Sequence, residues 1–136
     1  MTASSLDRSF APATAGSDVL STALVTLEVS GSASLPRLTA AGEIDCTSAP
    51  QVRAVLDRLL DAAPREVVVD LAAVTFLDSA GLCVLASAHR RAREQQVPMR
   101  VLASSRAVVR PLQITGLWRL LGAEQVEADA DDQSVA

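Results

Sequence analysis

Aromatic residues are scarce in this chain. They make up 2% of its 136 residues and tyrosine is missing, yet 49% of the residues are hydrophobic. A core with so few rings must be built from Val, Leu, Ile and Ala, a composition typical of a buried sheet packed against helices. The length is that of one domain, so a single core is expected.

Basic residues are outnumbered as well: 12 Lys and Arg stand against 16 Asp and Glu, which gives a net charge of −4. Proteins that bind nucleic acid need clustered cations to neutralise phosphates, so direct nucleic-acid binding is not expected. The densest basic group is Arg90, Arg91 and Arg93, in the last turns of a predicted helix. Cations complement the helix dipole there, and a solvated face is favoured over a binding patch.

Cysteine is rare too, since Cys46 and Cys83 are the only two. Two cysteines are too few for a disulfide framework, and no CxxC or Cys/His grouping predicts a metal site, so a reducing cytoplasm is expected. The opening residues lack the apolar core of a secretory signal, and no run reaches the about 18 uncharged apolar residues that span a bilayer. We therefore expect no membrane partner.

The common catalytic and nucleotide-binding motifs are also missing. The residue two positions before Ser79 is Leu77, where a nucleophile elbow requires glycine. The single histidine, His89, lies about ten residues further along the same predicted helix and is interpreted as a packed or half-exposed helix residue. Neither GxxxxGK[ST] nor GxGxxG occurs, so no cofactor and no enzymatic activity are expected. A hydrolase using Ser79 stays open only as a minor alternative.

Composition divides the chain into three parts. Residues 1–22 are rich in Ser, Ala, Thr, Pro and Gly without a sustained period, and we expect a disordered leader there. Residues 127–136 carry several aspartates and are expected to form an acidic disordered tail. The folded domain should occupy residues 23–126.

Hydrophobic patterns predict a mixed sheet that begins with a hairpin. Apolar residues from Leu24 to Val29 predict a first strand, and a Gly/Ser/Pro turn leads to a second at Arg37–Glu43. The continuous apolar run Val67–Leu71 is typical of a central strand buried on both faces. Met99–Leu102 predicts another strand, and Glu124–Val126 a last edge strand.

Helices are predicted between these strands. The first runs from Ala49 to near Ala62, with Ser48 and Gln51 as a capping box. Strand and helix then alternate from Arg37 to Leu102, which implies parallel pairing with right-handed crossovers. The expected fold is therefore α/β, with a mostly parallel sheet of four or five strands packed against helices.

A second helix should follow a loop at Ala72–Asp78. Its apolar face is predicted to contain Leu82, Leu85, Ala86 and His89. A short helix is expected at Arg106–Thr115, where Pro111 should force a kink or a restart. Trp118 and Phe76 are interpreted as core anchors.

Two polar residues, Asp78 and Ser79, fall where the central strand gives way to the second helix. Ligands of open α/β sheets bind at the carboxyl ends of strands. Either residue could instead serve only as the helix N-cap, because both side chains accept hydrogen bonds from free N–H groups of the first turn. Position alone leaves both interpretations open.

Three short motifs carry a resemblance to a known family. The segment Asp78–Leu82 (DSAGL), with Gly42–Asp45 (GEID) before it and Ile114–Leu117 (ITGL) after it, resembles the STAS domain of bacterial anti-sigma factor antagonists. The resemblance covers residues 23–126. The chain departs from the family pattern at Ala80, where a second serine is common, and at Cys83, which replaces a frequent glycine.

The resemblance implies the STAS fold and a partner-switching role. The unmodified protein would bind an anti-sigma factor that is also a serine kinase of the histidine-kinase ATPase type, and so free a sigma factor. Phosphorylation of Ser79 would break that complex, and a serine phosphatase would reset it. The alternative is a STAS scaffold or accessory subunit of a lipid-transport or signalling complex, in which Ser79 is only a helix cap.

The resemblance also implies a partner-binding surface around the serine. Its residues would be Asp45, Thr47, Asp78, Ser79, Leu82 and Cys83. Asp78 could cap the helix or help to place the kinase's magnesium and nucleotide, and capping is favoured. Cys83 could tune which partner docks, although a half-buried small hydrophobic residue is the favoured interpretation.

Overall fold

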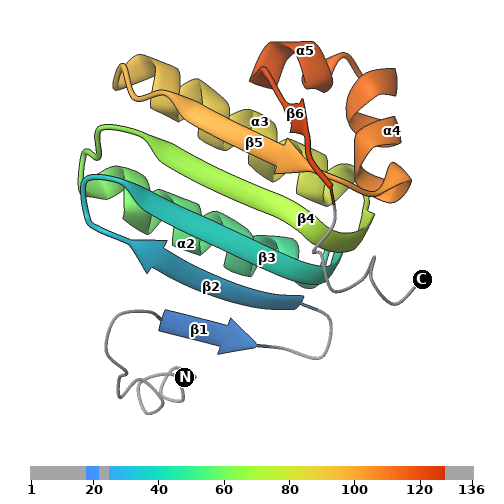
Figure 1. Cartoon of the computed structure of the whole chain (residues 1–136), viewed down its shortest axis with the longest axis horizontal. Coiled ribbons are helices and arrows are strands. Elements are labelled where there is room, and N and C mark those ends of the chain that lie inside the picture. The colour runs from blue at the N-terminus through green and yellow to red at the C-terminus, as the bar shows by residue number, and fades with distance from the viewer. Residues whose placement is uncertain (1–17, 22–24, 128–136) are drawn as a thin grey trace.

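The computed structural model describes residues 18–21 and 25–127, which form a sheet with helices packed on it (Figure 1). The strands are β1 (Asp18–Ser21), β2 (Val25–Gly31), β3 (Pro36–Ile44), β4 (Val67–Leu77), β5 (Met99–Ala103) and β6 (Glu124–Gln125). The helices of this part of the chain are α2 (Ala49–Asp61), α3 (Ser79–Glu94), α4 (Arg106–Ile114) and α5 (Leu117–Leu121).

The six strands lie in the sheet in their order along the chain. β1, β2 and β3 pair antiparallel, whereas β3, β4, β5 and β6 pair parallel. This arrangement confirms the predicted hairpin, the parallel pairing and the last edge strand. The sheet has six strands where four or five were predicted, because β1 adds a strand beside β2. α2 and α3 connect the parallel strands and lie side by side behind the same face of the sheet (Figure 1).

The core lies between that face and the helices. Along β4 the buried positions alternate, with Val67 and Val69 fully covered and Val68 and Asp70 only half-buried. The prediction that this strand is buried on both faces was therefore wrong, because helices cover the face of Val67 and leave the other more open. From the helices, the residues buried against the sheet include Val52, Leu56, Leu60, Val84, Leu85 and Ala88.

β4 is longer than the sequence pattern predicted. It runs to Leu77, so most of the predicted loop Ala72–Asp78 is strand. β3 supplies partners over this whole length, but the register shifts twice, between Thr39 and Ala41 and between Gly42 and Glu43. Each shift inserts an extra residue into β4 and breaks the alternation of apolar and polar positions that marks a strand in sequence.

β1 lies in the segment 1–22, where a disordered leader was predicted, and for Asp18–Ser21 that prediction was wrong. These four residues pair with β2, from Asp18 opposite Val29 to Ser21 opposite Thr26. The free edge of β2 offers main-chain N–H and C=O groups, so a short segment can pair there without a hydrophobic pattern of its own. The rest of the predicted leader and nearly all of the predicted acidic tail lie outside the described residues.

The buried face of α3 differs from the prediction. It consists of Gly81, Val84, Leu85, Ala88 and Ala92. Of the four residues predicted for this face only Leu85 is fully buried, and the others are half-buried. Small residues let the helix approach the sheet closely. The prediction relied on the large apolar residues of the helix, and these placed the buried face on the neighbouring side of α3.

Further along the chain, α4 continues through Pro111 without a break. The restart comes five residues later, at Gly116, whose φ of 82° is left-handed and precedes α5. The predicted interruption at Pro111 was therefore wrong in position. Trp118 on α5 is half-buried against the core, as predicted.

Replacement of Gly81 by alanine should destabilise the fold. A Cβ atom there would overlap Leu77 Cδ1 and lie 2.9 Å from Ile44 Cγ2, and both neighbours are buried. Overpacking costs about 1–3 kcal/mol, and the higher helix propensity of alanine returns about 1 kcal/mol or less. We expect a net loss of about 1–2 kcal/mol in the free energy of unfolding, measured in urea.

Leu77→Ala provides the matched test of this cause. If the overlap with Leu77 is responsible, Gly81→Ala should cost less in the Leu77→Ala background than in the wild type. An equal cost in both backgrounds would contradict the explanation.

Candidate functional site

The ends of β3 and β4 meet at one edge of the sheet. Ile44 is opposite Leu77 in the register, and the main-chain N–H of Asp78 donates to the carbonyl oxygen of Ile44 at 3.2 Å. The loop after β3 and the start of α3 are therefore neighbours. Two motifs that lie more than thirty residues apart in the sequence, GEID and DSAGL, come together at this edge.

Asp78 is the N-cap of α3. Its backbone is extended, and its Oδ1 accepts hydrogen bonds from the N–H groups of Ala80 at 2.8 Å and Gly81 at 3.2 Å. These bonds satisfy two donors that a helix start leaves without partners. The structure thus confirms the favoured capping role of Asp78.

Ser79 is the first residue of α3 and is exposed. Because Asp78 already caps the helix, that task does not fall to the serine. The Ser79 hydroxyl makes no hydrogen bond to any other residue that the structure describes. It is therefore a solvent-facing hydroxyl held on a rigid helix start.

The loop after β3 is organised by Asp45. Its Oδ1 accepts hydrogen bonds from the Thr47 hydroxyl at 2.7 Å, the Thr47 N–H at 2.8 Å and the Ser48 N–H at 3.1 Å. These bonds lower the pKa of Asp45 below its usual value, because they favour the charged form, and the bond from the Thr47 hydroxyl has the largest effect. A fixed negative charge therefore lies next to the start of α3.

Ser48 holds the same loop from inside. It is 2% exposed; its hydroxyl donates to the Glu43 carbonyl at 2.9 Å and accepts from the Asp45 N–H at 3.0 Å. The predicted capping box of Ser48 and Gln51 was wrong, since Ser48 makes no side-chain cap bond and its backbone (φ −100°, ψ −20°) is helical. Its hydroxyl fixes the turn instead of the helix.

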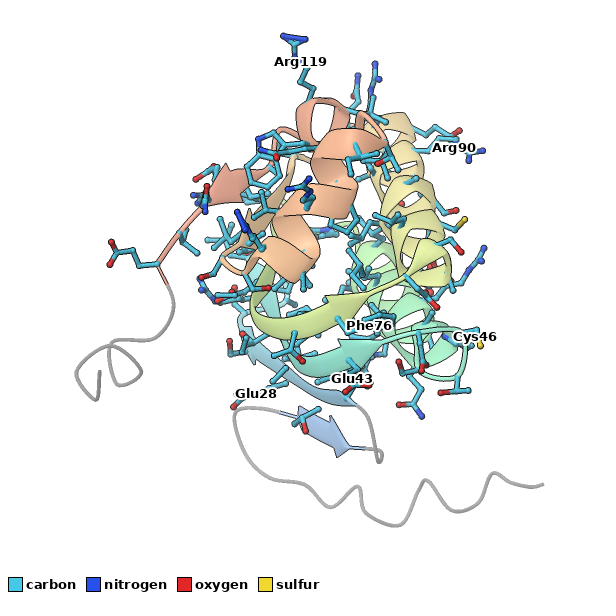
Figure 2. All side chains as sticks on the ribbon, turned by 90° about the vertical axis from the view of Figure 1, so that its right-hand side faces the viewer. Glu28, Glu43, Cys46, Phe76, Arg90 and Arg119 are labelled. Carbon is cyan, nitrogen blue, oxygen red and sulfur yellow. The ribbon has the colours of Figure 1, made fainter. Side chains whose placement is uncertain are left out.

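All six residues predicted for the partner surface lie at this edge of the sheet. Thr47, Ser79 and Cys83 are exposed, whereas Asp45, Asp78 and Leu82 are half-buried. The favoured interpretation of Cys83 as a half-buried residue was therefore wrong. It lies one helical turn beyond Ser79, on the same side of α3. Figure 2 looks onto this edge, where Glu43, Cys46 and Phe76 are labelled.

Phe76 was missed as a surface residue. It is 46% exposed, so its prediction as a core anchor was wrong. After the register shift at Gly42, Glu43 is opposite Phe76, and Leu77 instead occupies the buried position against the helices. A signal was present in the sequence, because two consecutive large apolar residues in one strand face opposite sides of the sheet.

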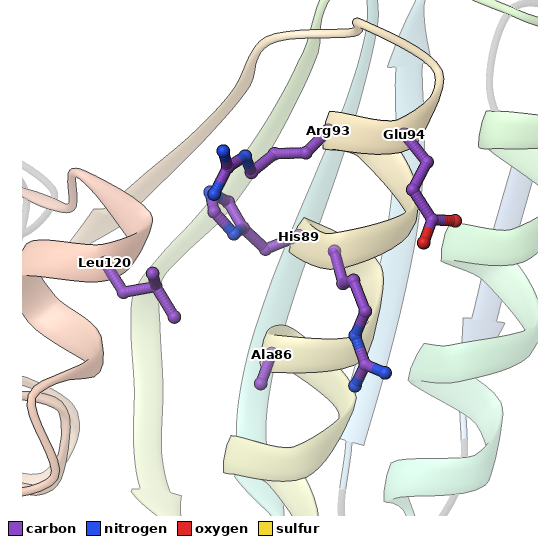
Figure 3. Close-up of a pocket in the computed structure, with 6 residues that line it drawn as sticks. Ala86, His89, Arg93, Glu94 and Leu120 are labelled. Carbon is purple, nitrogen blue, oxygen red and sulfur yellow. The ribbon is translucent and has the colours of Figure 1, made fainter.

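A groove lies between α3 and α5, away from Ser79 (Figure 3). This groove has a volume of about 470 Å³ and is lined by Ala86, His89, Arg90, Arg93, Glu94 and Leu120. His89 and Arg93 lie beside each other there, while Arg91 points to α2 and forms ion pairs with Asp57 and Asp61. Burial, and then the charge of Arg93, lowers the pKa of His89.

Ser79 and His89 do not form a catalytic pair. Ser79 and His89 are ten residues apart on one helix, a rise of about 15 Å, so the histidine cannot act as a base for the serine. No three His, Cys, Asp or Glu side chains gather as metal ligands in the described ranges 18–21 and 25–127. No helix in these ranges is long and apolar enough to cross a membrane.

Comparisons with known proteins agree with this geometry. The family model described as STAS domain matches residues 26–130. The anti-sigma-B factor antagonist of Listeria monocytogenes is 32% identical over 65% of this chain and 78% of its own. The anti-sigma-F factor antagonist RsfB of Mycobacterium tuberculosis is 31% identical over 68% and 75%. The crystal structure of an anti-sigma factor antagonist from Mycobacterium paratuberculosis has a TM-score of 0.69 and 29% identity, covering 83% of this chain and 94% of that one.

Loss of the Asp78 cap should weaken the fold, whereas loss of the neighbouring hydroxyl should not. Asp78→Ala removes both bonds to the helix start and should lower the free energy of unfolding by about 1 kcal/mol. Ser79→Ala removes an exposed group and should stay within about 0.5 kcal/mol of the wild type. Urea unfolding of both variants checks this pair, and equal losses would contradict the assignment of the cap to Asp78.

The pKa of His89 should lie below its usual value near 6.5. NMR titration of the imidazole measures it directly. Arg93→Gln should raise the pKa by removing the like charge, but should not restore the usual value, because burial is the larger cause. Arg65→Gln, on the connection between α2 and β4, is the control and should leave the titration unchanged.

Proposed function

The chain belongs to the STAS domain family, and on that premise we propose that it is an anti-sigma factor antagonist switched by phosphorylation of Ser79. The names of its relatives support this role. The observation that carries the proposal is the Ser79 hydroxyl: it is exposed, it starts α3, and Asp78 relieves it of capping. The unmodified chain would bind an anti-sigma factor and so free a sigma factor.

The partner would dock on the edge formed by the ends of β3 and β4. There the loop of Asp45 and the start of α3 are held by main-chain and side-chain hydrogen bonds, so little conformational entropy is lost when they are covered. Six residues form the proposed contact: Asp45, Thr47, Asp78, Ser79, Leu82 and Cys83. The unmodified serine allows the partner to pack closely on this surface.

Phosphorylation would leave the fold intact. A phosphate adds about −1.5 to −2 charges at neutral pH and three strong acceptor oxygens. The start of α3 tolerates such a group, since an anion is favoured by the helix dipole and Ser79 projects into solvent. The modified domain should therefore remain folded.

The interface would not survive the same change. The new charge would lie beside Asp78 and near the ionised Asp45. The chain has twelve basic residues, all arginines, and none of them is among the six contact residues. A partner that packs tightly on the bare hydroxyl would desolvate the phosphate oxygens without pairing them, which can cost several kcal/mol. Addition of the phosphate would therefore release the partner.

The chain would act as a substrate and not as an enzyme. The anti-sigma factor, a serine kinase of the histidine-kinase ATPase type, would supply Mg·ATP and transfer its γ-phosphoryl group to the Ser79 oxygen, with loss of the hydroxyl proton and release of ADP. A serine phosphatase would hydrolyse the ester and restore the hydroxyl. The cytoplasm supplies the ATP that this cycle needs.

We expect one phosphate to be added when the purified chain is incubated with its anti-sigma factor kinase and Mg·ATP. Intact mass measures the addition, which should be absent in Ser79→Ala and present in the control Ser87→Ala, a serine further along α3. A pull-down with the purified anti-sigma factor should capture the unmodified chain and lose the phosphorylated one.

Ser79→Asp should weaken capture as well, because it adds a negative charge at the same position. Retention of the partner by both the phosphorylated chain and Ser79→Asp would exclude the switch and favour the scaffold alternative.

A further inference from the structure

Phe76 is a large apolar side chain on an otherwise polar edge. It is 46% exposed, although the chain has only three aromatic residues and could have used each in its core. Its neighbour Leu77 is 5% exposed and contributes to that core. The exposure of Phe76 is therefore a consequence of the strand geometry and not of a disordered end.

The register shift in β4 fixes this orientation. Gly42 is opposite Val74, whereas Glu43 is opposite Phe76, so Thr75 is the extra residue between them. The Thr75 hydroxyl donates to the Gly42 carbonyl at 3.3 Å and so holds the irregular turn of the strand. Leu77 then faces the helices, and Phe76 faces away from them.

Phe76 lies next to the proposed switch. Only Leu77 and Asp78 separate it from Ser79, so the Cα atoms of Phe76 and Ser79 are three steps apart and at most about 11 Å from each other. Glu43 is its cross-strand neighbour and is also exposed. Figure 2 shows Phe76, Glu43 and Cys46 on the same edge of the molecule.

Other exposed large apolar residues lie elsewhere in the described structure. Leu35 precedes β3 at the opposite end of the strand, Ile114 ends α4, and Leu120 lies on α5, with exposures of 50%, 74% and 52%. Leu35 is therefore separated by the whole length of β3 from the edge where β3 and β4 end. It provides a matched control for the loss of exposed apolar area.

We propose that Phe76 anchors the anti-sigma factor at the Ser79 edge, by inserting into an apolar pocket of the partner that carries an Arg or Lys for Glu43. This inference rests on the proposed function. Interfaces depend on a few aromatic anchors surrounded by polar contacts, and Phe76 is the aromatic side chain at this edge among the residues that the structure describes. Glu43 gives the partner's pocket its expected charge, since complementary charges fix the register of docking.

The anchor also explains how a phosphate on Ser79 acts on the whole contact. Ser79 and Phe76 are held on one rigid unit by the hydrogen bonds of Asp78 to the end of β3 and to the start of α3. A partner displaced from Ser79 by the volume of a phosphate is therefore displaced from Phe76 as well. Both contacts should be lost together.

The anti-sigma factor that the unmodified chain captures is purified and titrated against full-length variants of the chain. The test measures the dissociation constant of each complex. Phe76→Ala should raise it at least 30-fold, as expected of an anchor. Leu35→Ala should change it less than about twofold, because it removes exposed apolar area at the opposite end of β3. Glu43→Gln should slow association and reduce its salt dependence.

Thermal unfolding separates an anchor from a structural role. Phe76→Ala should unfold within a few degrees of the wild type, as surface substitutions do, and Phe76→Leu should retain part of the binding. A large loss of thermal stability would show that the ring supports the fold, and would overturn the proposal.

Ser79→Asp distinguishes failure of the Phe76 anchor from failure of the Ser79 switch. Release of the partner by Ser79→Asp with undiminished binding by Phe76→Ala would overturn the anchor and leave the switch standing. Undiminished binding by both variants, or failure to capture any anti-sigma factor, would overturn the proposed function and the anchor together.

Discussion

The join between the ends of β3 and β4 is the constraint on which the rest of the structure depends. Ile44 is opposite Leu77, and the bond from the Asp78 N–H to the Ile44 carbonyl extends this register by one residue into the loop. Because both strands run parallel, their following loops emerge at the same edge. The turn of Asp45 and the start of α3 are thereby fixed relative to each other without any direct bond between their side chains.

At the same join, two adjacent polar residues have different roles. Asp78 uses its carboxylate on the helix start, and Gly81 lets that helix approach Leu77 and Ile44 more closely than any other residue could. Ser79 is left with no structural task. A hydroxyl that contributes nothing to the fold can be modified and restored without unfolding the domain, which is what a reversible switch requires.

The sequence predicts the elements that follow regular periods, and fails where the period is interrupted. The hairpin, the parallel order, the limits of α2 and the cap at Asp78 were all accessible, since each depends on local spacing. The extension of β4 was not, because two register shifts break the alternation in the segment that was predicted to be a loop. The pairing of Asp18–Ser21 was missed for another reason, since it depends on a free strand edge.

The site residues, too, could be predicted where they depend on local position and not where they depend on an irregularity. Ser79 and Asp78 could be located from their position between an apolar run and a helix, but the exposure of Cys83 could not, because it depends on how α3 is rotated. The adjacent pair Phe76 and Leu77 indicates that one of the two faces outward, but which one depends on where β4 bulges. One irregularity links both levels: the extra residue Thr75 directs Leu77 into the core, where it contacts Gly81, and directs Phe76 outward. The packing that sets α3 against the sheet is therefore the packing that creates the apolar surface beside Ser79.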